Sequence, residues 1–281
     1  MQAEAATSEA LAHLGITQWI VRRRHPQNQT DLTKRALFRT ECSGGKQNLS
    51  NGNRAELEIA KGAAVNFAVA LKDAMSALAV LIAIVAYGIY AWKSLRGDAR
   101  PHPLSWLIFG VLTGTGYLVQ VDQQAGPGSW VMAITTIVCF LLCVMSFSRG
   151  ERTFPWYEWA FLAAAAVVFV FYLWSRDPDL IAAAGDGAPH DLLIRYAPEI
   201  SASLAAFVSV LGFGPTITKA WARPHSDSAS VFLLNGLKFV PSFFALDTIS
   251  VATTVMPAAL VVANAGVALI IFLRRWQVKL N

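Results

Sequence analysis

The sequence has little charge. Asp, Glu, Lys and Arg make up 15% of its 281 residues, whereas an average soluble domain has about 25%. The shortage is greatest after Asp73, because residues 1–73 alone carry 17 of these charged side chains. Hydrophobic residues make up 55% of the chain. This composition excludes a disordered protein, and it argues against a nucleic-acid-binding domain despite a formal net charge of +5.

Cysteine is also scarce, with three residues in the chain. Cys139 and Cys143 lie four positions apart in one apolar run, so on a helix they share a face and cannot form a disulfide bond. Cys42 stands alone, which excludes a secreted disulfide scaffold. No Cys and His spacing is typical of zinc, and no nucleophile–His–acid order or phosphate-binding loop is present. We therefore expect no metal, no cofactor and no enzymatic activity.

Long charge-free runs are abundant. The hydrocarbon core of a bilayer is about 30 Å thick and needs about 20 apolar helical residues to cross it. Seven runs between consecutive charges approach this length, and the sixth contains one charge, Lys238. They are residues 74–92, 104–121, 129–147, 159–175, 200–218, 228–246 and 254–273. The sequence therefore predicts an all-α integral membrane protein with seven transmembrane helices.

The distribution of Lys and Arg predicts the orientation of these helices. The loops after spans one, three and five and the C-terminal tail carry ten Lys and Arg, whereas the loops after spans two, four and six carry Arg176 and Arg195. Positive residues concentrate in cytoplasmic loops. An alternation of this kind requires an odd number of spans. It predicts an inner (plasma) membrane protein with a cytoplasmic C-terminus, residues 276–281.

The N-terminal segment, residues 1–73, does not fit this topology well. It includes Arg22-Arg23-Arg24 and would have to cross the membrane. Residues 25–54 are polar and predict disorder, whereas the apolar spacing in residues 55–71 predicts a helix. Two interpretations remain open: the segment is a translocated or interfacial extension, or the native protein starts at Met75.

The first three spans resemble the last three, with loop lengths that differ by a few residues and a constant offset of 125 residues from Ser105 and Ser230 onward. Lys93, followed by Arg100-Pro101-His102 and Ser105, recurs as Lys219, followed by Arg223-Pro224-His225 and Ser230. The offset aligns further pairs, namely Gly110 with Asn235, Thr113 with Lys238, Tyr117 with Ser242 and Asp122 with Asp247. Both units run from outside to inside, so the repeat is parallel, and the fourth span returns the chain.

One motif carries a family resemblance. Gly214-Pro215-Thr216 through Trp221, followed by the serine-rich entry Ser228 to Asn235, resembles the motif of the PQ-loop superfamily, with Thr216 in place of the Gln. This superfamily includes the SWEET sugar transporters, their half-size SemiSWEET relatives and cystinosin-like proteins. The resemblance covers Met75 to Arg275, although the first unit has Tyr90-Ala91 where the motif would stand.

The resemblance implies a 3+1+3 architecture and the function of a carrier. The first unit would cover residues 74–147, a linker helix with its outer loop residues 148–199, and the second unit residues 200–275. Family hinge prolines correspond to Pro215 and Pro241, while spans one and two have no proline. The family places an Asn facing the substrate on the third helix of each unit. Asn264 fits that position, although such an Asn could also simply join two helices.

Lys238 is the most informative single residue, because it lies near the middle of a span, where an ionisable group is costly and usually faces a cavity. With Asn235 and Ser242 it has i, i+3, i+7 spacing, which predicts one polar stripe. No Asp or Glu lies at matching depth, so Lys238 is either neutral or paired with a group outside the chain. The alternative is a structural Lys bonded to helix carbonyls.

Other polar residues complete the predicted site. Thr113 and Tyr117 would face the same cavity, while Gly110 and Gly114 form a GxxxG pattern typical of close helix packing. Asp122 and Asp247 are interpreted as solvated charges or as proton-coupling groups. The sequence thus favours a carrier of a small polar or anionic solute in the lipid bilayer, with no nucleic-acid partner and a homo-oligomer left open. The alternative is a non-transporting receptor or sensor with the same fold.

Overall fold

The computed structural model describes residues 51–97, 101–149, 156–177, 181, 188–222, 224 and 228–280. The chain divides into two units, Met1–Val65 and Asn66–Asn281. In the first unit, the described residues form the beginning of helix α4 (Asn51–Arg96), where Lys61 and Glu58 form an i,i+3 ion pair at 3.5 Å. The predicted helix over residues 55–71 is confirmed, whereas residues 51–54, predicted to be disordered, are helical. The rest of the predicted extension lies outside the described residues.

Within the described residues the fold is all-α. The 3₁₀ helix η1 (Gly126–Ser129) lies between α5 and α6. The α-helices that follow α4 are α5 (Pro103–Asp122), α6 (Trp130–Arg149), α7 (Trp156–Trp174), α9 (Ala188–Arg195), α10 (Ala197–Gly212), α11 (Gly214–Ala222), α12 (Ala229–Leu237), α13 (Phe239–Phe244) and α14 (Val251–Leu280). The short helix α9 falls in a segment for which the sequence predicted only an outer loop.

Among the described residues, six helices are long and apolar enough to cross a membrane. They contain predicted spans one to five and seven, and α10 and α11 together form the fifth. Predicted span six is different. The structure has there a shorter apolar segment, Ala229–Phe244, made of α12 and α13. The protein is thus an integral membrane protein with six candidate spans, which are six of the seven predicted ones. Whether the shorter segment Ala229–Phe244 also crosses stays a prediction.

Pro241 explains the interruption between α12 and α13 at Lys238. A proline inside a helix removes one backbone hydrogen bond and crowds the carbonyl four residues earlier, here that of Leu237. Lys238 itself keeps helical angles, with φ −57° and ψ −27°, and its N–H still bonds the Leu234 carbonyl at 3.1 Å. The chain direction therefore changes little, but the lysine lies at the junction of two short helices.

A second proline acts in the same way between α10 and α11. Gly214-Pro215 begins α11, and Phe213 is the C-cap of α10. A residue before proline is disfavoured in the helical region, and Pro215 cannot donate to the Leu211 carbonyl. The helix resumes at once, because Ile217 donates to the Phe213 carbonyl at 2.9 Å.

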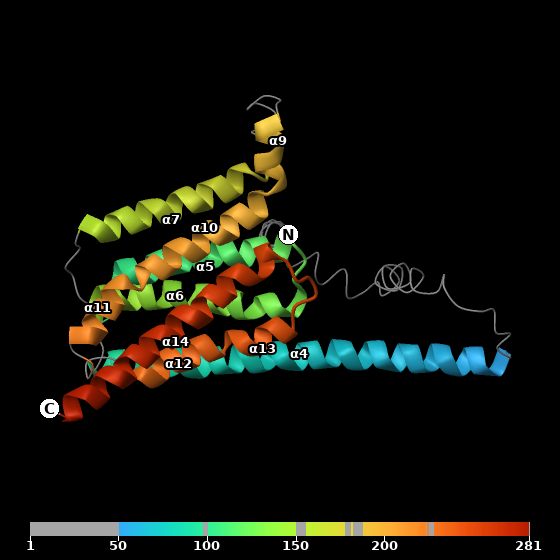
Figure 1. Ribbon diagram of the computed structural model, residues 1–281, viewed down its shortest axis with the longest axis horizontal. Coiled ribbons are helices and arrows are strands. Elements are labelled where there is room, and N and C mark those ends of the chain that lie inside the picture. The colour runs from blue at the N-terminus through green and yellow to red at the C-terminus, as the bar shows by residue number, and fades with distance from the viewer. Residues whose placement is uncertain are drawn as a thin grey trace, which may run out of the picture. The chain divides into compact units, whose positions relative to one another are not determined.

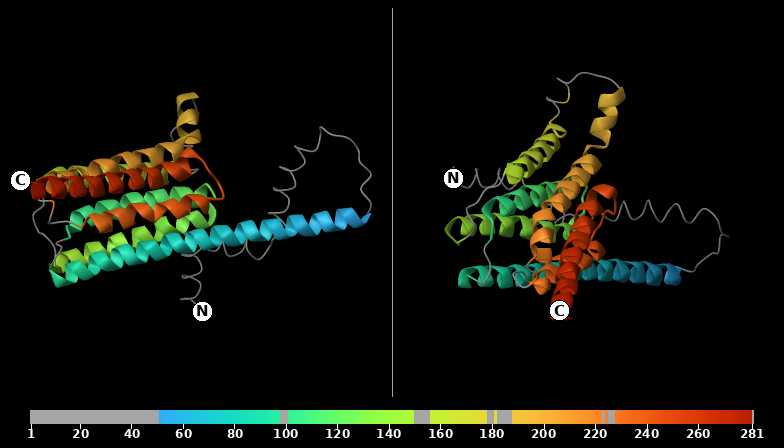
Figure 2. Two further views of the ribbon diagram at one scale, coloured as in Figure 1. Left: turned by 60° about the horizontal axis from the view of Figure 1, so that its bottom comes forward. Right: turned by 60° about the vertical axis from the view of Figure 1, so that its left-hand side comes forward.

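The long helices of residues 66–281 lie alongside one another in a bundle, and the short helix α9 points away from it, as Figure 1 and Figure 2 show. Helix α5 packs against α6, α7 and α10, and α14 packs against α10, α11 and α12. The GxxxG glycines agree with this packing: a Cβ atom on Gly110 would lie 3.1 Å from the Phe140 ring, and one on Gly114 would lie 3.3 Å from Thr136. The predicted close contact between these helices is therefore present.

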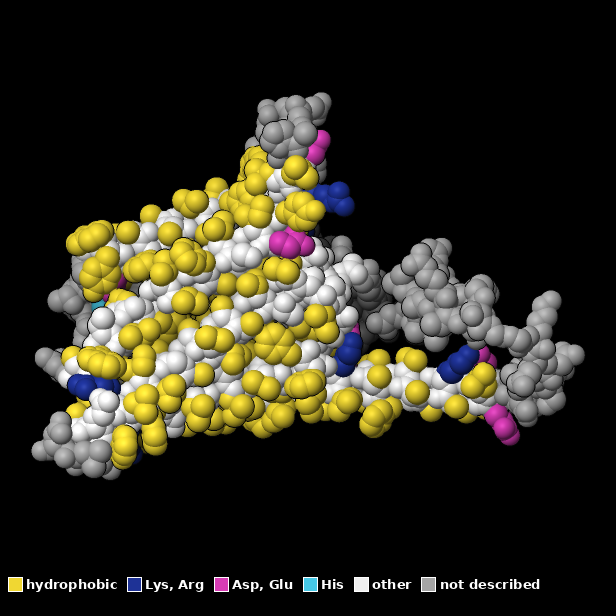
Figure 3. Space-filling view, viewed as in Figure 1, with side chains coloured by type: hydrophobic (Ala, Val, Ile, Leu, Met, Phe, Trp, Pro, Cys, Tyr) yellow, Lys and Arg dark blue, Asp and Glu magenta, His cyan; other side chains and the backbone are white. Residues whose placement is uncertain are grey.

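The outer surface of the bundle is apolar. Large hydrophobic side chains such as Leu81, Phe140, Val170 and Phe207 are exposed. On the face drawn in Figure 3, hydrophobic side chains cover the helices of the bundle, and few charged side chains lie among them. A soluble protein rarely exposes so much continuous apolar surface, and lipid is the solvent that suits it.

Two loops from distant parts of the chain meet at one end of the bundle. We call this the loop contact, formed by residues 124–128 and 245–248. The N–H of Asp247 donates to the Ala125 carbonyl at 2.9 Å, and the N–H of Gly128 donates to the Ala245 carbonyl at 3.1 Å. The Asp247 carboxylate also accepts from Lys72 Nζ at 2.8 Å. Backbone pairing therefore joins the ends of α5 and α13.

The loop contact is possible only because two of its residues lack a side chain. A Cβ atom on Gly128 would lie 2.7 Å from the backbone oxygen of Ser242 and 2.9 Å from the backbone nitrogen of Leu246. Gly126 has a φ of +71°, a conformation that residues with a side chain rarely adopt.

Candidate functional site

The candidate site is centred on Lys238, whose side chain is 1% exposed. Its Nζ donates to the hydroxyl oxygen of Tyr87, on α4, at 2.7 Å. It also donates to Asn235 Oδ1, one turn earlier on α12, at 3.1 Å. We call these three residues the Lys238 cluster. The lysine thus links the second half of the chain to the first membrane helix, over a separation of 151 residues.

Aromatic rings surround the lysine nitrogen. Nζ lies 4.0 Å from the ring centroid of Tyr87 and 4.9 Å from that of Phe239. Trp106, on α5, packs edge-on against Tyr87 with ring centroids 6.3 Å apart, which limits the positions open to the tyrosine ring. A cation near an aromatic face is stabilised by about 0.5–2 kcal/mol. The rings therefore stabilise a positive charge on the lysine nitrogen, in addition to the hydrogen bonds that this nitrogen donates.

Small polar side chains of α5 and α6 lie next to the Lys238 cluster. Thr135 and Cys139 are neighbours of the Tyr87 side chain, and Thr113 is a neighbour of Cys139. Thr113 is 1% exposed, and its hydroxyl accepts from Thr136 at 3.1 Å. In the sequence, Cys139 stands out only for sharing an apolar run with Cys143, and the structure adds that it is buried beside Tyr87.

Within the described part of the chain, Lys238 takes part in no ion pair. The ion pairs there are Lys61–Glu58, Lys72–Asp247, His102–Glu158 and Arg176–Asp122. This agrees with the sequence, which has no acidic residue at the depth of Lys238. An uncompensated charge is costly to bury, so the absence of a carboxylate is the feature that a function must explain.

The predicted polar stripe is only partly joined by hydrogen bonds. Asn235 bonds Lys238, but Ser242 Oγ donates to the Phe239 carbonyl at 2.7 Å and is 2% exposed. Asn264 is 6% exposed and donates to the Leu260 carbonyl of its own helix at 2.8 Å. It lies beside Gly236, where a Cβ atom would come within 3.3 Å of the asparagine Cβ. Asn264 therefore packs against α12 at Gly236, two residues before the lysine.

The remaining predicted residues differ in their surroundings. Thr113 donates to the Phe109 carbonyl at 2.7 Å, and Tyr117 is partly buried against the hydrophobic core. Of the predicted hinge prolines, Pro241 is buried and follows Lys238 by three residues in the sequence. Pro215 is exposed at the start of α11. No described contact joins Tyr117 or Pro215 to Lys238, so their roles stay predictions.

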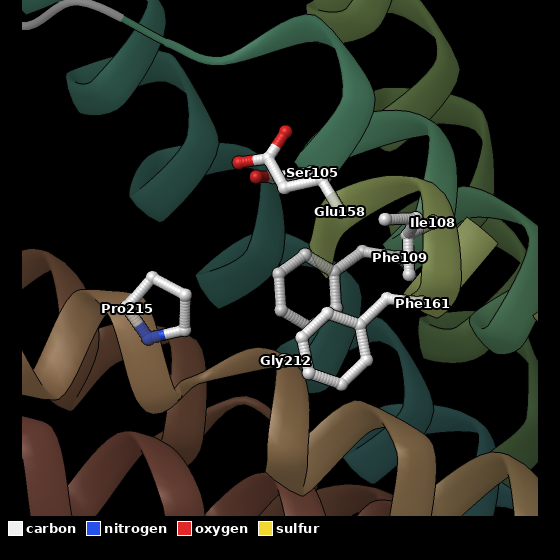
Figure 4. Close-up of a pocket in the computed structure, with 7 residues that line it drawn as sticks. All are labelled: Ser105, Ile108, Phe109, Glu158, Phe161, Gly212 and Pro215. Carbon is white, nitrogen blue, oxygen red and sulfur yellow. The ribbon is translucent and has the colours of Figure 1, made fainter. Parts of the chain in front are cut away.

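A second polar site, which the sequence did not predict, lies where α5 and α7 begin. His102 Nδ1 is 2.9 Å from Glu158 Oε2, and the two side chains are 13% and 10% exposed. In the sequence, His102 stands out only as part of the repeated Arg-Pro-His motif, and Glu158 does not stand out. A small pocket adjoins this pair. Figure 4 shows Glu158 and Ser105 side by side there, across from the rings of Phe109 and Phe161.

The pocket has about 20 Å³ of space for the centres of water-sized molecules, enough for one or two waters. It is lined by Ser105, Ile108, Phe109, Glu158, Phe161, Gly212 and Pro215. Gly212 and Pro215 belong to the junction between α10 and α11. The pocket therefore contains a predicted hinge residue but none of the predicted solute-binding residues.

Asp122 is not the freely solvated charge that the sequence suggested. It accepts from the Tyr172 hydroxyl at 2.6 Å and pairs with Arg176 Nη2 at 2.9 Å. Its side chain is 21% exposed. These contacts fasten the end of α7 to the end of α5, so they give Asp122 a structural role in this conformation. Asp247, at 42% exposed, is paired with Lys72.

Two residues of the site region were missed by sequence reasoning. Tyr87 lies in an apolar run and carries no motif, so nothing in its spacing identified it as the partner of Lys238. Gln120 is 1% exposed and donates to the Thr253 carbonyl of α14 at 2.7 Å. It was visible in the sequence as an amide inside a charge-free run. Among the described residues, no group of His, Cys, Asp and Glu could hold a metal ion.

Comparison with family models, with curated proteins and with solved structures finds no significant match for this chain.

Proposed function

We propose that this protein is a non-enzymatic membrane carrier that moves a small polar solute by alternating access, with the Lys238 cluster as its solute site. The main observation that supports this proposal is a fully buried lysine whose hydrogen-bond partners are a phenol and an amide. Ionisable residues inside membrane helices usually mark a substrate or ion pathway. In the absence of solute, Tyr87 and Asn235 hold the lysine side chain.

In this proposal the short segment Ala229–Phe244 crosses the membrane as predicted span six, which brings the number of spans to seven. The helices then form two parallel units around α7. The sequence repeat and the resemblance to the PQ-loop superfamily support this arrangement. So does the position of Lys238 between two short helices, since carriers often build midplane sites where a membrane helix is interrupted. Asn264, Ser242, Thr113 and Tyr117 would line the site when it opens, and the junctions at Pro215 and Pro241 would act as hinges.

The proposed orientation of the helices in the membrane follows from the distribution of Lys and Arg among the loops. A reporter fused after Arg275 should be cytoplasmic, and one inserted near residue 185 should be on the outer side. If both reporters lay on the same side, the segment Ala229–Phe244 would not cross the membrane, and the proposed pair of units would be wrong.

Transport in proteoliposomes is the direct test. Purified protein should move at least one member of a panel of small sugars, amino acids and carboxylates faster than empty vesicles do. The Lys238→Met variant, which keeps the length of the apolar stem, should lose this flux while remaining folded. Lys72→Met is the matched control, because it removes a lysine outside the cluster and should retain flux. Unchanged flux in Lys238→Met would contradict the proposed site.

A non-transporting receptor or sensor is the second candidate. It is favoured by the close packing around Lys238, which is 1% exposed and linked to α4 through Tyr87. A ligand that breaks this link would change the packing of α4 without crossing the membrane. Ligand binding with no flux of that ligand in proteoliposomes would favour this function over transport.

A further inference from the structure

We infer that the ligand of the Lys238 cluster is a small monovalent anion. The inference rests on the proposed function for the location of the site, but it concerns the chemistry of the ligand. It follows from three arguments: the surroundings of Lys238 suit a cation, an ammonium hydrogen there lacks a described acceptor, and the charge of the site has to be balanced.

The surroundings of Lys238 stabilise a cation. The rings of Tyr87 and Phe239 lie 4.0 and 4.9 Å from Nζ, and a neutral amine would gain little from either ring face. The Tyr87 and Asn235 oxygens both accept from Nζ, which is also the role that suits an ammonium group. The cluster is thus arranged for a positive charge but contains no negative one.

An ammonium group at Lys238 has one hydrogen more than the acceptors described around it. An ammonium group has three hydrogens, and the described residues offer it two acceptors, on Tyr87 and Asn235. The hydroxyls of Thr113, Thr135 and Ser242 donate to the carbonyls of Phe109, Val131 and Phe239, and none of them accepts from Lys238 among the described contacts. The ligand that best completes the cluster is therefore an acceptor with negative charge.

The charge balance sets the valence of the ligand. Lys238 contributes one positive charge, and the other cations in the described ion pairs already have acidic partners. A monovalent anion would leave the site neutral, whereas a divalent anion would leave a buried negative charge, which is costly. The close packing around the lysine also favours a small ion, such as chloride, nitrate, formate or acetate. The anion would replace Tyr87 or Asn235 beside Nζ.

Thermal unfolding of the full-length protein in detergent tests this inference. The protein should be titrated with the sodium salts of chloride, nitrate, formate and acetate, with glucose as a neutral probe and sulfate as a divalent one. A ligand that binds only the folded state raises the apparent Tm with the logarithm of its concentration above Kd. At about 100 times Kd we expect a rise of about 5 °C for at least one monovalent anion, and no comparable rise with glucose or sulfate.

Variants separate binding at Lys238 from general salt effects. Lys238→Met should lose the anion-specific rise, whereas Lys72→Met should keep it, because Lys72 pairs with Asp247 outside the cluster. If Lys238→Met does not fold, Tyr87→Phe provides the second test: it keeps the charge but removes one hydroxyl, so it should shift the midpoint of the anion titration. No anion-specific rise in the wild type, or an equal rise in Lys238→Met, would overturn the inference.

The outcome for the anion is separable from the outcome for transport. Anion binding at Lys238 without flux would support this inference and contradict the carrier. Flux of a neutral solute that depends on Lys238, without any anion-specific rise in Tm, would support the carrier and contradict this inference.

Discussion

The loop contact and the Lys238 cluster both join distant parts of the chain, but by opposite means. The loop contact pairs backbone with backbone and depends on two missing side chains, at Gly126 and Gly128. The Lys238 cluster depends on what its side chains carry, namely a cation, a phenol and an amide. One contact has no room for an extra atom, and the other has no counter-charge.

This difference separates a structural contact from a candidate functional one. Backbone pairing with complementary shape leaves no polar group unsatisfied, so it needs no ligand to explain it. A buried cation held only by neutral groups is a more costly arrangement. Substitutions should therefore affect stability most at the loop contact and ligand binding most at Lys238.

The largest loss of stability is expected from Gly128→Ala. The new Cβ atom would lie within 3 Å of backbone atoms of Ser242 and Leu246, so the two loops would have to separate. The variant should lose about 3 kcal/mol of unfolding free energy, the upper range for an overpacked site. Thermal unfolding in detergent measures the effect. Its matched control is Gly88→Ala in α4, where a Cβ atom meets nothing within 4 Å.

In the control, alanine should be neutral or slightly stabilising, because alanine favours helix over glycine by about 1 kcal/mol. If Gly128→Ala unfolded at the same temperature as Gly88→Ala, the two loops would not pack as described. The contrast between the two regions would then be lost.

Tyr87→Phe should have an intermediate effect. It removes the oxygen that accepts from Lys238 at 2.7 Å but keeps the ring, and a hydrogen bond to a charged group contributes about 1.5–3 kcal/mol. Unfolding free energy should fall by about this amount, and reagents that modify amines should label Lys238 faster in the folded protein. Tyr90→Phe, one turn further along α4, is the control. Equal labelling of Lys238 in both variants would argue against Tyr87 as its anchor.

Lys72→Met should have the smallest effect. The Lys72–Asp247 pair is partly exposed, with side chains 34% and 42% exposed, and pairs of this kind contribute at most about 1 kcal/mol. Unfolding should change by less than this amount, and the difference from wild type should shrink as salt is added. A loss as large as that of Gly128→Ala would mean that the ion pair, and not the glycines, holds the loop contact together.

The membrane class and most helices could be predicted because they depend on local composition. Charge-free runs identified α5, α6 and α7 within a few residues, since the length of an apolar run reflects the thickness of a bilayer. The same rule gave too long a helix around Lys238. It counts hydrophobicity and does not include the hydrogen bond that Pro241 removes.

Sequence analysis found the site residues whose type is rare in a membrane helix and missed those whose type is common there. Lys238 is conspicuous in a membrane helix, and its spacing to Asn235 gave a correct hydrogen-bonded pair. Tyr87 is an ordinary residue in an apolar run, and its contact with Lys238 depends on how α4 packs against a helix 151 residues away. The same reason explains His102 and Glu158, which are brought together by the packing of α5 on α7.

The short segment Ala229–Phe244 has a consequence for the choice of lipid. With nine and six residues on either side of Lys238, it is about 24 Å long at 1.5 Å per residue, less than the roughly 30 Å of a typical hydrocarbon core. If it spans the membrane, the bilayer must thin beside it, at a cost that grows with acyl-chain length. Vesicles of short-chain lipids should therefore suit this protein better than those of long-chain lipids, and any activity assigned to Lys238 should follow bilayer thickness.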